Sequence, residues 1–193
     1  ADVQPSYLLK FYLFALVGFM CGLKGAESSK GSLFMDEENG QNLLLCINSL
    51  QHLGSAPPQA IYWSYISARA KHMNMPTVEP QDLALARLAC LTRSTRISKG
   101  ELLSAWNSLS PDDRMVLIEH FLADGINECA ILFACLPAFF ASCKGNLLIG
   151  LKGGFALFVE LVVLLRQRLS VEMSETFLIR VNLSDIAFFA DKV

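Results

Sequence analysis

The three histidines of this chain are spaced unsuitably for the common zinc-hydrolase helix. That helix carries two His residues at positions i and i+4, whereas no two of His52, His72 and His120 are four residues apart. Glu119, His120 and Asp124 contain the groups of an acid–base set, but the polar face of one helix explains them more simply. We therefore expect neither a catalytic residue nor a metal site at these positions.

Phosphate-binding and hydrolase motifs are also missing. The stretch 145–152 (GNLLIGLK) resembles a phosphate-binding loop only in outline, because Leu151 separates the second Gly from Lys152 and no Ser or Thr follows. Neither a Gly-x-Ser-x-Gly elbow nor a Gly-x-Gly-x-x-Gly fingerprint occurs. The six cysteines form no Cys-x-x-Cys pair, which favours reduced structural thiols and leaves a disulfide open. The sequence thus predicts a protein that is not an enzyme and binds no cofactor.

The composition indicates a mainly helical chain with unusually apolar segments. Of its 193 residues, 53% are hydrophobic and only 18% are charged, against about 25% charged in ordinary soluble domains. The net charge of −2 offers no general attraction for nucleic acid. The predicted class is all-α.

The polar part of the chain, 42–125, is predicted to be a domain of short capped helices. Apolar spacing and stop signals place helices at about 42–53, 57–74, 79–91, 98–108 and 110–125. Ser98 and Glu101 form a capping box, and Ser110 followed by Pro111 is a strong helix start. The acidic run 36–38 lacks the ligand order of a calcium loop and is interpreted as a solvated helix start.

The least polar part of the chain, 126–169, is predicted to be a hydrophobic helical hairpin. Two apolar runs, 126–143 and 147–165, are joined by Lys144, Gly145 and Asn146, and Pro137 is expected to kink the first helix. Helices without a polar face are buried on all sides, either in lipid or in the core of a bundle. We favour the membrane and keep the soluble core as the alternative.

Six residues of the second run are candidate interaction residues. Two of them are Gly residues with the spacing that permits close helix contact in membranes. Two are Arg residues that follow the run, as basic residues at a membrane interface do. The remaining two are the only charged residues within the run. A charge inside an apolar run is costly unless it faces protein, water or a head group. The candidates are Gly150, Gly154, Lys152, Glu160, Arg166 and Arg168.

The two ends of the chain have separate predictions. Residues 1–24 are predicted to form a hydrophobic helix that serves as an anchor or a docking helix, followed by a linker over 25–41. Residues 170–193 alternate apolar and polar groups, and their spacing favours an amphipathic helix over a strand.

A family resemblance concerns 57–124. The matching residues are Pro58, Ala60, Tyr62, Tyr65, Arg69, Ile97, Ser98, Lys99, Trp106, Leu109, Ser110, Asp112, Asp113 and Arg114. In these positions the segment resembles a degenerate high-mobility-group (HMG) box, a three-helix L-shaped module. The resemblance implies core positions for Tyr62, Tyr65 and Trp106. Boxes that bind DNA are strongly basic, whereas this segment has seven basic and seven acidic residues; the resemblance therefore implies a box turned to protein contacts.

The leading functional hypothesis is a non-catalytic accessory subunit of a multi-protein membrane complex, with the mitochondrial inner membrane as the suggested setting. Its partners would be other subunits and lipid, with no small-molecule substrate. One alternative is a soluble α-helical interaction protein that buries a hydrophobic hairpin, as pore-forming or apoptosis-regulator bundles do. A second alternative is a nucleic-acid-binding HMG-box protein, which the balanced charge disfavours.

Overall fold

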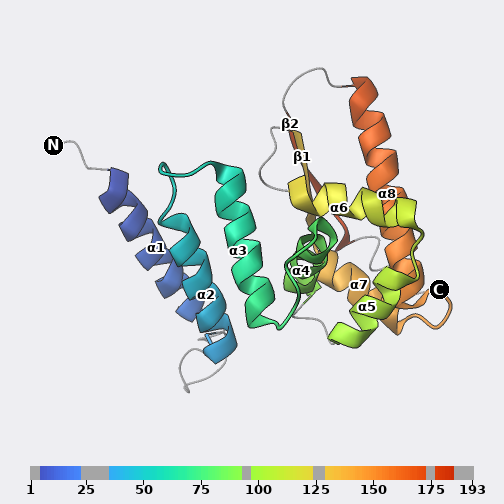
Figure 1. Ribbon diagram of the computed structural model, residues 1–193, viewed down its shortest axis with the longest axis horizontal. Coiled ribbons are helices and arrows are strands. Elements are labelled where there is room, and N and C mark those ends of the chain that lie inside the picture. Colours follow the sequence, from blue (N-terminus) through green and yellow to red (C-terminus); the bar gives the residue numbers. More distant parts are fainter. Residues whose placement is uncertain (1–4, 23–34, 93–96, 124–128, 173–176, 185–193) are drawn as a thin grey trace. The chain divides into compact units, whose positions relative to one another are not determined.

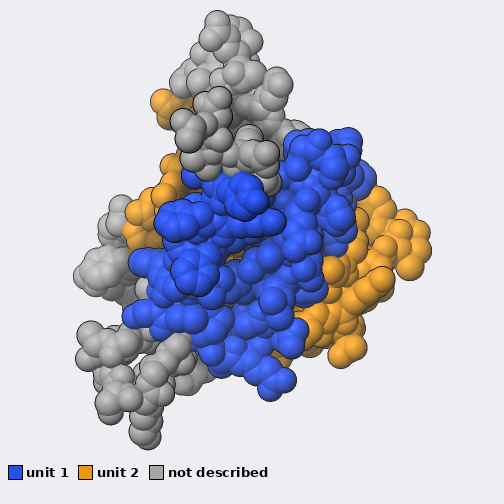
Figure 2. Space-filling model, turned by 90° about the vertical axis from the view of Figure 1, so that its left-hand side faces the viewer, with its two compact units in different colours: residues 1–65 blue, residues 66–193 orange. Residues whose placement is uncertain are grey.

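The computed structural model describes residues 5–22, 35–92, 97–123, 129–172 and 177–184 (Figure 1). Within these ranges the chain forms eight helices and two short strands, which confirms the predicted all-α class. It divides into two compact units, residues 1–65 and 66–193 (Figure 2), which are described separately below. The division falls inside the predicted helical domain 42–125.

The first unit contains α1 (Pro5–Gly22), α2 (Glu37–Leu50) and the start of α3 (Pro58–His72). α2 begins at the acidic run, because the Asp36 side chain accepts a hydrogen bond from the Asn39 N–H at 2.7 Å. Glu37 and Glu38 follow in the first turn, where the helix dipole favours negative charge. The acidic run is therefore a helix start, as predicted. The helix begins before the predicted Asn42, so 25–41 is not a linker throughout.

Local capping signals define the short helices of the second unit, α4 (Pro80–Thr92), α5 (Lys99–Asn107) and α6 (Pro111–Ala123). Ser98 and Glu101 form the predicted capping box at α5. At the start of α6, the Asp113 N–H donates a hydrogen bond of 3.1 Å to Oγ of Ser110, the residue directly before Pro111. The predicted capping box at Ser98 and the predicted helix start at Ser110 are therefore confirmed.

The first half of the predicted hairpin contains a strand instead of a long kinked helix. β1 (Cys129–Ala134) pairs in parallel with β2 (Phe177–Asn182), in register from Cys129 opposite Phe177 to Ala134 opposite Asn182. The prediction of a helix over 126–143 is therefore wrong for residues 129–134, which form β1. The predicted C-terminal amphipathic helix is wrong over 177–182, and residues 185–193 lie outside the described residues. Parallel strands require a long crossover, which α7 and α8 supply.

A shorter helical hairpin follows β1, formed by α7 (Leu136–Gly145) and α8 (Gly150–Glu172). Pro137 lies at the start of α7, where the missing N–H costs nothing, so it begins a helix and does not kink one. Asn146 closes the turn, because its Oδ1 accepts hydrogen bonds from the N–H groups of Leu148 and Ile149.

An aromatic cluster forms the core of the second unit. Phe158 of α8 is fully buried and touches five rings from α6, β1 and α7. α8 also buries Phe155 and Val162, while Glu160 and Leu164 are exposed. The low polarity of α8 is thus explained largely by packing within this unit. The rings around Phe158 are those of His120, Phe121, Phe133, Phe139 and Phe140.

Candidate interaction surface

The two candidate glycines have different roles at the α7–α8 hairpin. Gly150 has φ +61° and open space around it, so it serves the turn into α8. Gly154 lies against α7, where an added Cβ would come 2.7 Å from Cys143 Cβ. The close helix contact expected from the Gly spacing therefore exists at Gly154, and it is a contact within this chain.

The four charged candidates lie on the outer side of α8 or near its end. Arg166 Nη1 pairs with Glu119 Oε2 of α6 at 3.1 Å, so its partner belongs to the same unit. Lys152, Glu160 and Arg168 are exposed. In the part of the chain that the structure describes, no ion pair joins Lys152 to Glu160. A contact of Lys152, Glu160 or Arg168 with a partner protein stays a prediction.

Glu119 and His120, two members of the considered acid–base set, lie in different surroundings. Glu119 turns to Arg166, whereas His120 is 95% buried (5% exposed) among the rings of Phe121, Phe133 and Phe158. Asp124 lies outside the described residues. The interpretation as the polar face of a helix is therefore wrong for His120, which lies in the core beside a cavity of about 230 Å³. This cavity is lined by Arg87, Leu91, His120, Phe121, Leu132, Phe133 and Leu136.

A charged contact joins α5 to α7. Lys144 Nζ lies 2.8 Å from Glu101 Oε1, and Glu101 also accepts hydrogen bonds from the Ser98 N–H and hydroxyl. The hydrogen bond from Lys144, followed by those from Ser98, lowers the pKa of Glu101 from 4.5 to about 2. The carboxylate is therefore more stable in the folded than in the unfolded chain.

We expect this pair to make stability sensitive to acid. Because the folded pKa of Glu101 is depressed, its stabilising contribution is complete above pH 4.5 and is lost as the pH falls toward 2. Glu101→Gln should therefore destabilise the protein at pH 6 and progressively less toward pH 2. Urea unfolding midpoints across this range measure the effect. Glu160→Gln, which removes a carboxylate of α8 outside this ion pair, is the comparison variant. The same dependence of unfolding midpoint on pH in both variants would contradict the assignment.

The exposed aromatic face of α1 is the most distinctive surface of the first unit. Tyr7, Phe11 and Phe14 follow at i, i+4 and i+7, so they share one side of the helix. Together with Leu8, Tyr12 and Phe19 on the adjoining surface of the helix, these side chains are 60% to 77% exposed. We call this surface the aromatic face; it comprises Tyr7, Leu8, Phe11, Tyr12, Phe14 and Phe19.

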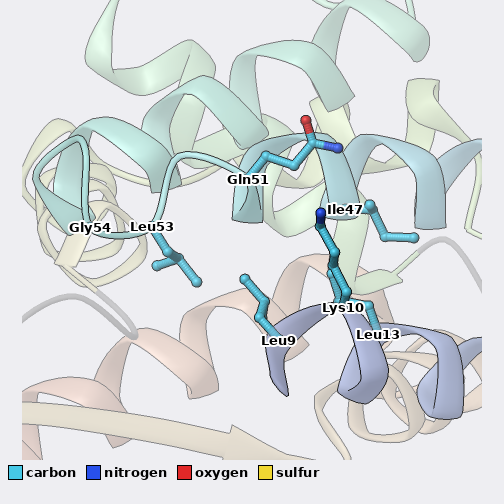
Figure 3. Close-up of a pocket in the computed structure, with 7 residues that line it drawn as sticks. All are labelled: Leu9, Lys10, Leu13, Ile47, Gln51, Leu53 and Gly54. Atoms are coloured by element: carbon cyan, nitrogen blue, oxygen red, sulfur yellow. The ribbon is translucent and has the colours of Figure 1, made fainter. Parts of the chain in front are cut away.

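A groove of about 950 Å³ lies on another side of α1 (Figure 3). Its apolar lining comes from Leu9 and Leu13 of α1, Ile47 of α2 and Leu53 of the turn that follows α2. Figure 3 shows the Lys10 side chain extending from α1 toward α2. Lys10 and Gln51 supply the polar side chains of the lining, and Gly54, with φ +82°, completes it.

Sequence reasoning identified α1 as a hydrophobic helix but missed its two faces. The signal was present in the spacing, since the aromatic residues recur at 7, 11 and 14 while Leu recurs at 9, 13 and 16. Periodicity could not predict the position of α2. Side chains of α2 and of its following turn form a groove with one of these two sides of α1.

The core positions implied by the HMG-box resemblance are only partly buried. Trp106 is buried, whereas Tyr62 and Tyr65 are half-buried. The resemblance itself stays a prediction.

Within the ranges that the structure describes, no helix is both long enough and apolar enough to cross a membrane. The same ranges contain no cluster of His, Cys, Asp and Glu suited to a metal ion. Comparison of the chain with known protein families, curated proteins and solved structures gives no match.

Proposed function

We propose that this protein is a non-catalytic helical subunit that binds another protein through the aromatic face of α1. The observation that carries this proposal is the presence of six large apolar side chains, all at least 60% exposed, on one helix of 18 residues. Exposed apolar residues scattered singly are ordinary, but a contiguous group marks an interaction site. Tyr and Phe are also enriched at protein interfaces.

The composition of α1 favours a protein partner over a lipid surface. Helices that lie on membranes are typically rich in Lys and Arg along a polar face. α1 carries only Lys10 between Pro5 and Gly22 and has no polar face of this kind. The small exposed residues Ala15 and Gly18 would allow close approach of a partner backbone. A helix inserted into an apolar groove of another protein accounts for all these features.

Packing in the second unit supports the alternative of an interaction protein with a buried hairpin. α7 and α8 direct Phe139, Phe140, Phe155 and Phe158 into one core, so their low polarity requires no lipid. A place in a membrane complex, at the mitochondrial inner membrane or elsewhere, stays a prediction and would depend on α1 or on the partner.

Replacing Phe11 and Phe14 together with Ser should remove the chain from its complex. Central aromatic residues of an interface typically contribute at least about 2 kcal/mol each, so the double replacement should lower the affinity by roughly a thousandfold when the two contributions add. The measurement is the native mass of the tagged full-length chain purified from its own cells, followed by the dissociation constant for the partner identified there. A monomeric wild-type chain would disprove the proposal.

The matched control replaces Val78 and Met115 with Ser. Both side chains are large, apolar and exposed, and both belong to the second unit. This variant should retain the complex. Binding to vesicles of phosphatidylcholine and cardiolipin tests for a lipid contact instead. If the wild type binds vesicles tightly, and the α1 variant loses this binding but keeps the protein complex, the aromatic face contacts lipid and the proposal is overturned.

A further inference from the structure

We propose that the groove beside α1 binds a single medium-chain fatty acid, with its carboxylate at Lys10 and its alkyl chain along the apolar lining. The groove lies within the first unit, and its lining contains none of the six residues of the aromatic face, although Lys10 borders that face at the Tyr7 ring. This inference does not require the proposed protein contact. Its volume of about 950 Å³ falls within the roughly 300–1,000 Å³ usual for small-molecule sites.

The lining matches the alkyl chain of such a ligand. Leu9 and Leu13 are four residues apart on α1 and therefore form a continuous apolar strip. Ile47 of α2 and Leu53 of the following turn complete an apolar lining. Leu9, Leu13 and Ile47 are only partly exposed and Leu53 is exposed, so an alkyl chain in the space between α1 and α2 would cover apolar surface on both sides (Figure 3).

The charge at the groove matches a carboxylate. Lys10 is exposed, and its Nζ lies 5.8 Å from the centre of the Tyr7 ring. In the described part of the chain no carboxylate pairs with Lys10, so its ammonium group can receive an anion. The Gln51 amide can donate a hydrogen bond as a second polar group. A cation beside an apolar groove selects an amphiphile with an anionic head.

Calorimetric titration with dodecanoate, dodecanol and dodecyltrimethylammonium, each below its micelle concentration, tests the inference. The full-length protein should bind one dodecanoate and prefer it over the alcohol by roughly two- to fivefold, as expected for an exposed ion pair. The cationic amphiphile should bind more weakly than either. Octanoate should bind at least about tenfold more weakly than dodecanoate, since each buried methylene contributes roughly fourfold.

Two variants test the contact with the carboxylate of the ligand separately from the contact with its alkyl chain. Lys10→Gln should abolish the preference for the acid over the alcohol while leaving alcohol binding unchanged. Leu13→Ala should weaken acid and alcohol alike. Circular dichroism should show that both variants keep the helix content of the wild type. Preference for the cationic amphiphile, or wild-type selectivity in Lys10→Gln, would overturn the inference.

Two controls connect the result to this groove. Lys71→Gln removes an exposed cation of α3 and should bind dodecanoate like the wild type. The Phe11 and Phe14 double replacement alters only the aromatic face and should also retain binding. Loss of fatty-acid binding in this double variant would assign the ligand to the aromatic face and overturn the inference, whereas loss of the protein complex alone would not.

Discussion

Replacement of Phe158 by Ala should lower the free energy of unfolding by about 3–5 kcal/mol, the range for a buried Phe. Phe158 has no exposed surface, and its ring contacts five others, including a T-shaped contact with Phe133 at 4.8 Å between centroids. Removing the ring loses its burial and these edge contacts and leaves a cavity between α6, β1, α7 and α8. Loss on this scale is a large part of the total stability of a domain.

Urea unfolding followed by circular dichroism measures this effect. Leu164→Ala is the matched control, because Leu164 lies on the same helix but is 62% exposed; its change should stay within about 0.5 kcal/mol. Phe158→Leu should fall between the two and remains measurable if the Ala variant does not fold. Equal effects at positions 158 and 164 would show that the aromatic cluster is not the core.

Replacement of Gly154 by Val should destabilise the protein by about 3 kcal/mol, at the upper end for overpacking. An added Cβ would lie 2.7 Å from Cys143 Cβ and 3.0 Å from its Sγ. The first of these atoms is attached directly to the α7 backbone, so rotation of a side chain cannot relieve the contact. α7 and α8 would have to separate, which would loosen the packing of Phe140 against Phe155.

A double-mutant cycle tests this explanation. Cys143→Gly removes the opposing Cβ, so Gly154→Val should cost less in that background, although the new Gly itself costs about 1 kcal/mol. Gly145→Val is the control, because Gly145 ends α7 with no neighbour within 4 Å of its added Cβ. Additive effects at 143 and 154 would show that the two helices are not in close contact there.

The sequence by itself determined the features that depend on a few neighbouring residues. The start of α5 is an example, because Ser98 and Glu101 satisfy each other's backbone groups within one turn. The starts at Asp36 and Ser110 have the same local origin. The all-α class follows from the sum of such signals. The helical character of α1 could also be predicted, together with its apolarity.

Only the tertiary structure decided the conformation and surroundings of the apolar segments. A short uncharged run fits a buried strand as well as a helix, and β1 is a strand because β2, far along the chain, supplies its hydrogen-bond partners. Pro137 likewise begins α7 because β1 ends before it. The groove at Lys10 exists because α2 and its turn lie beside α1, and Gly154 matters because Cys143 faces it. Such contacts join residues distant in sequence, and local spacing carries no record of which segments will meet.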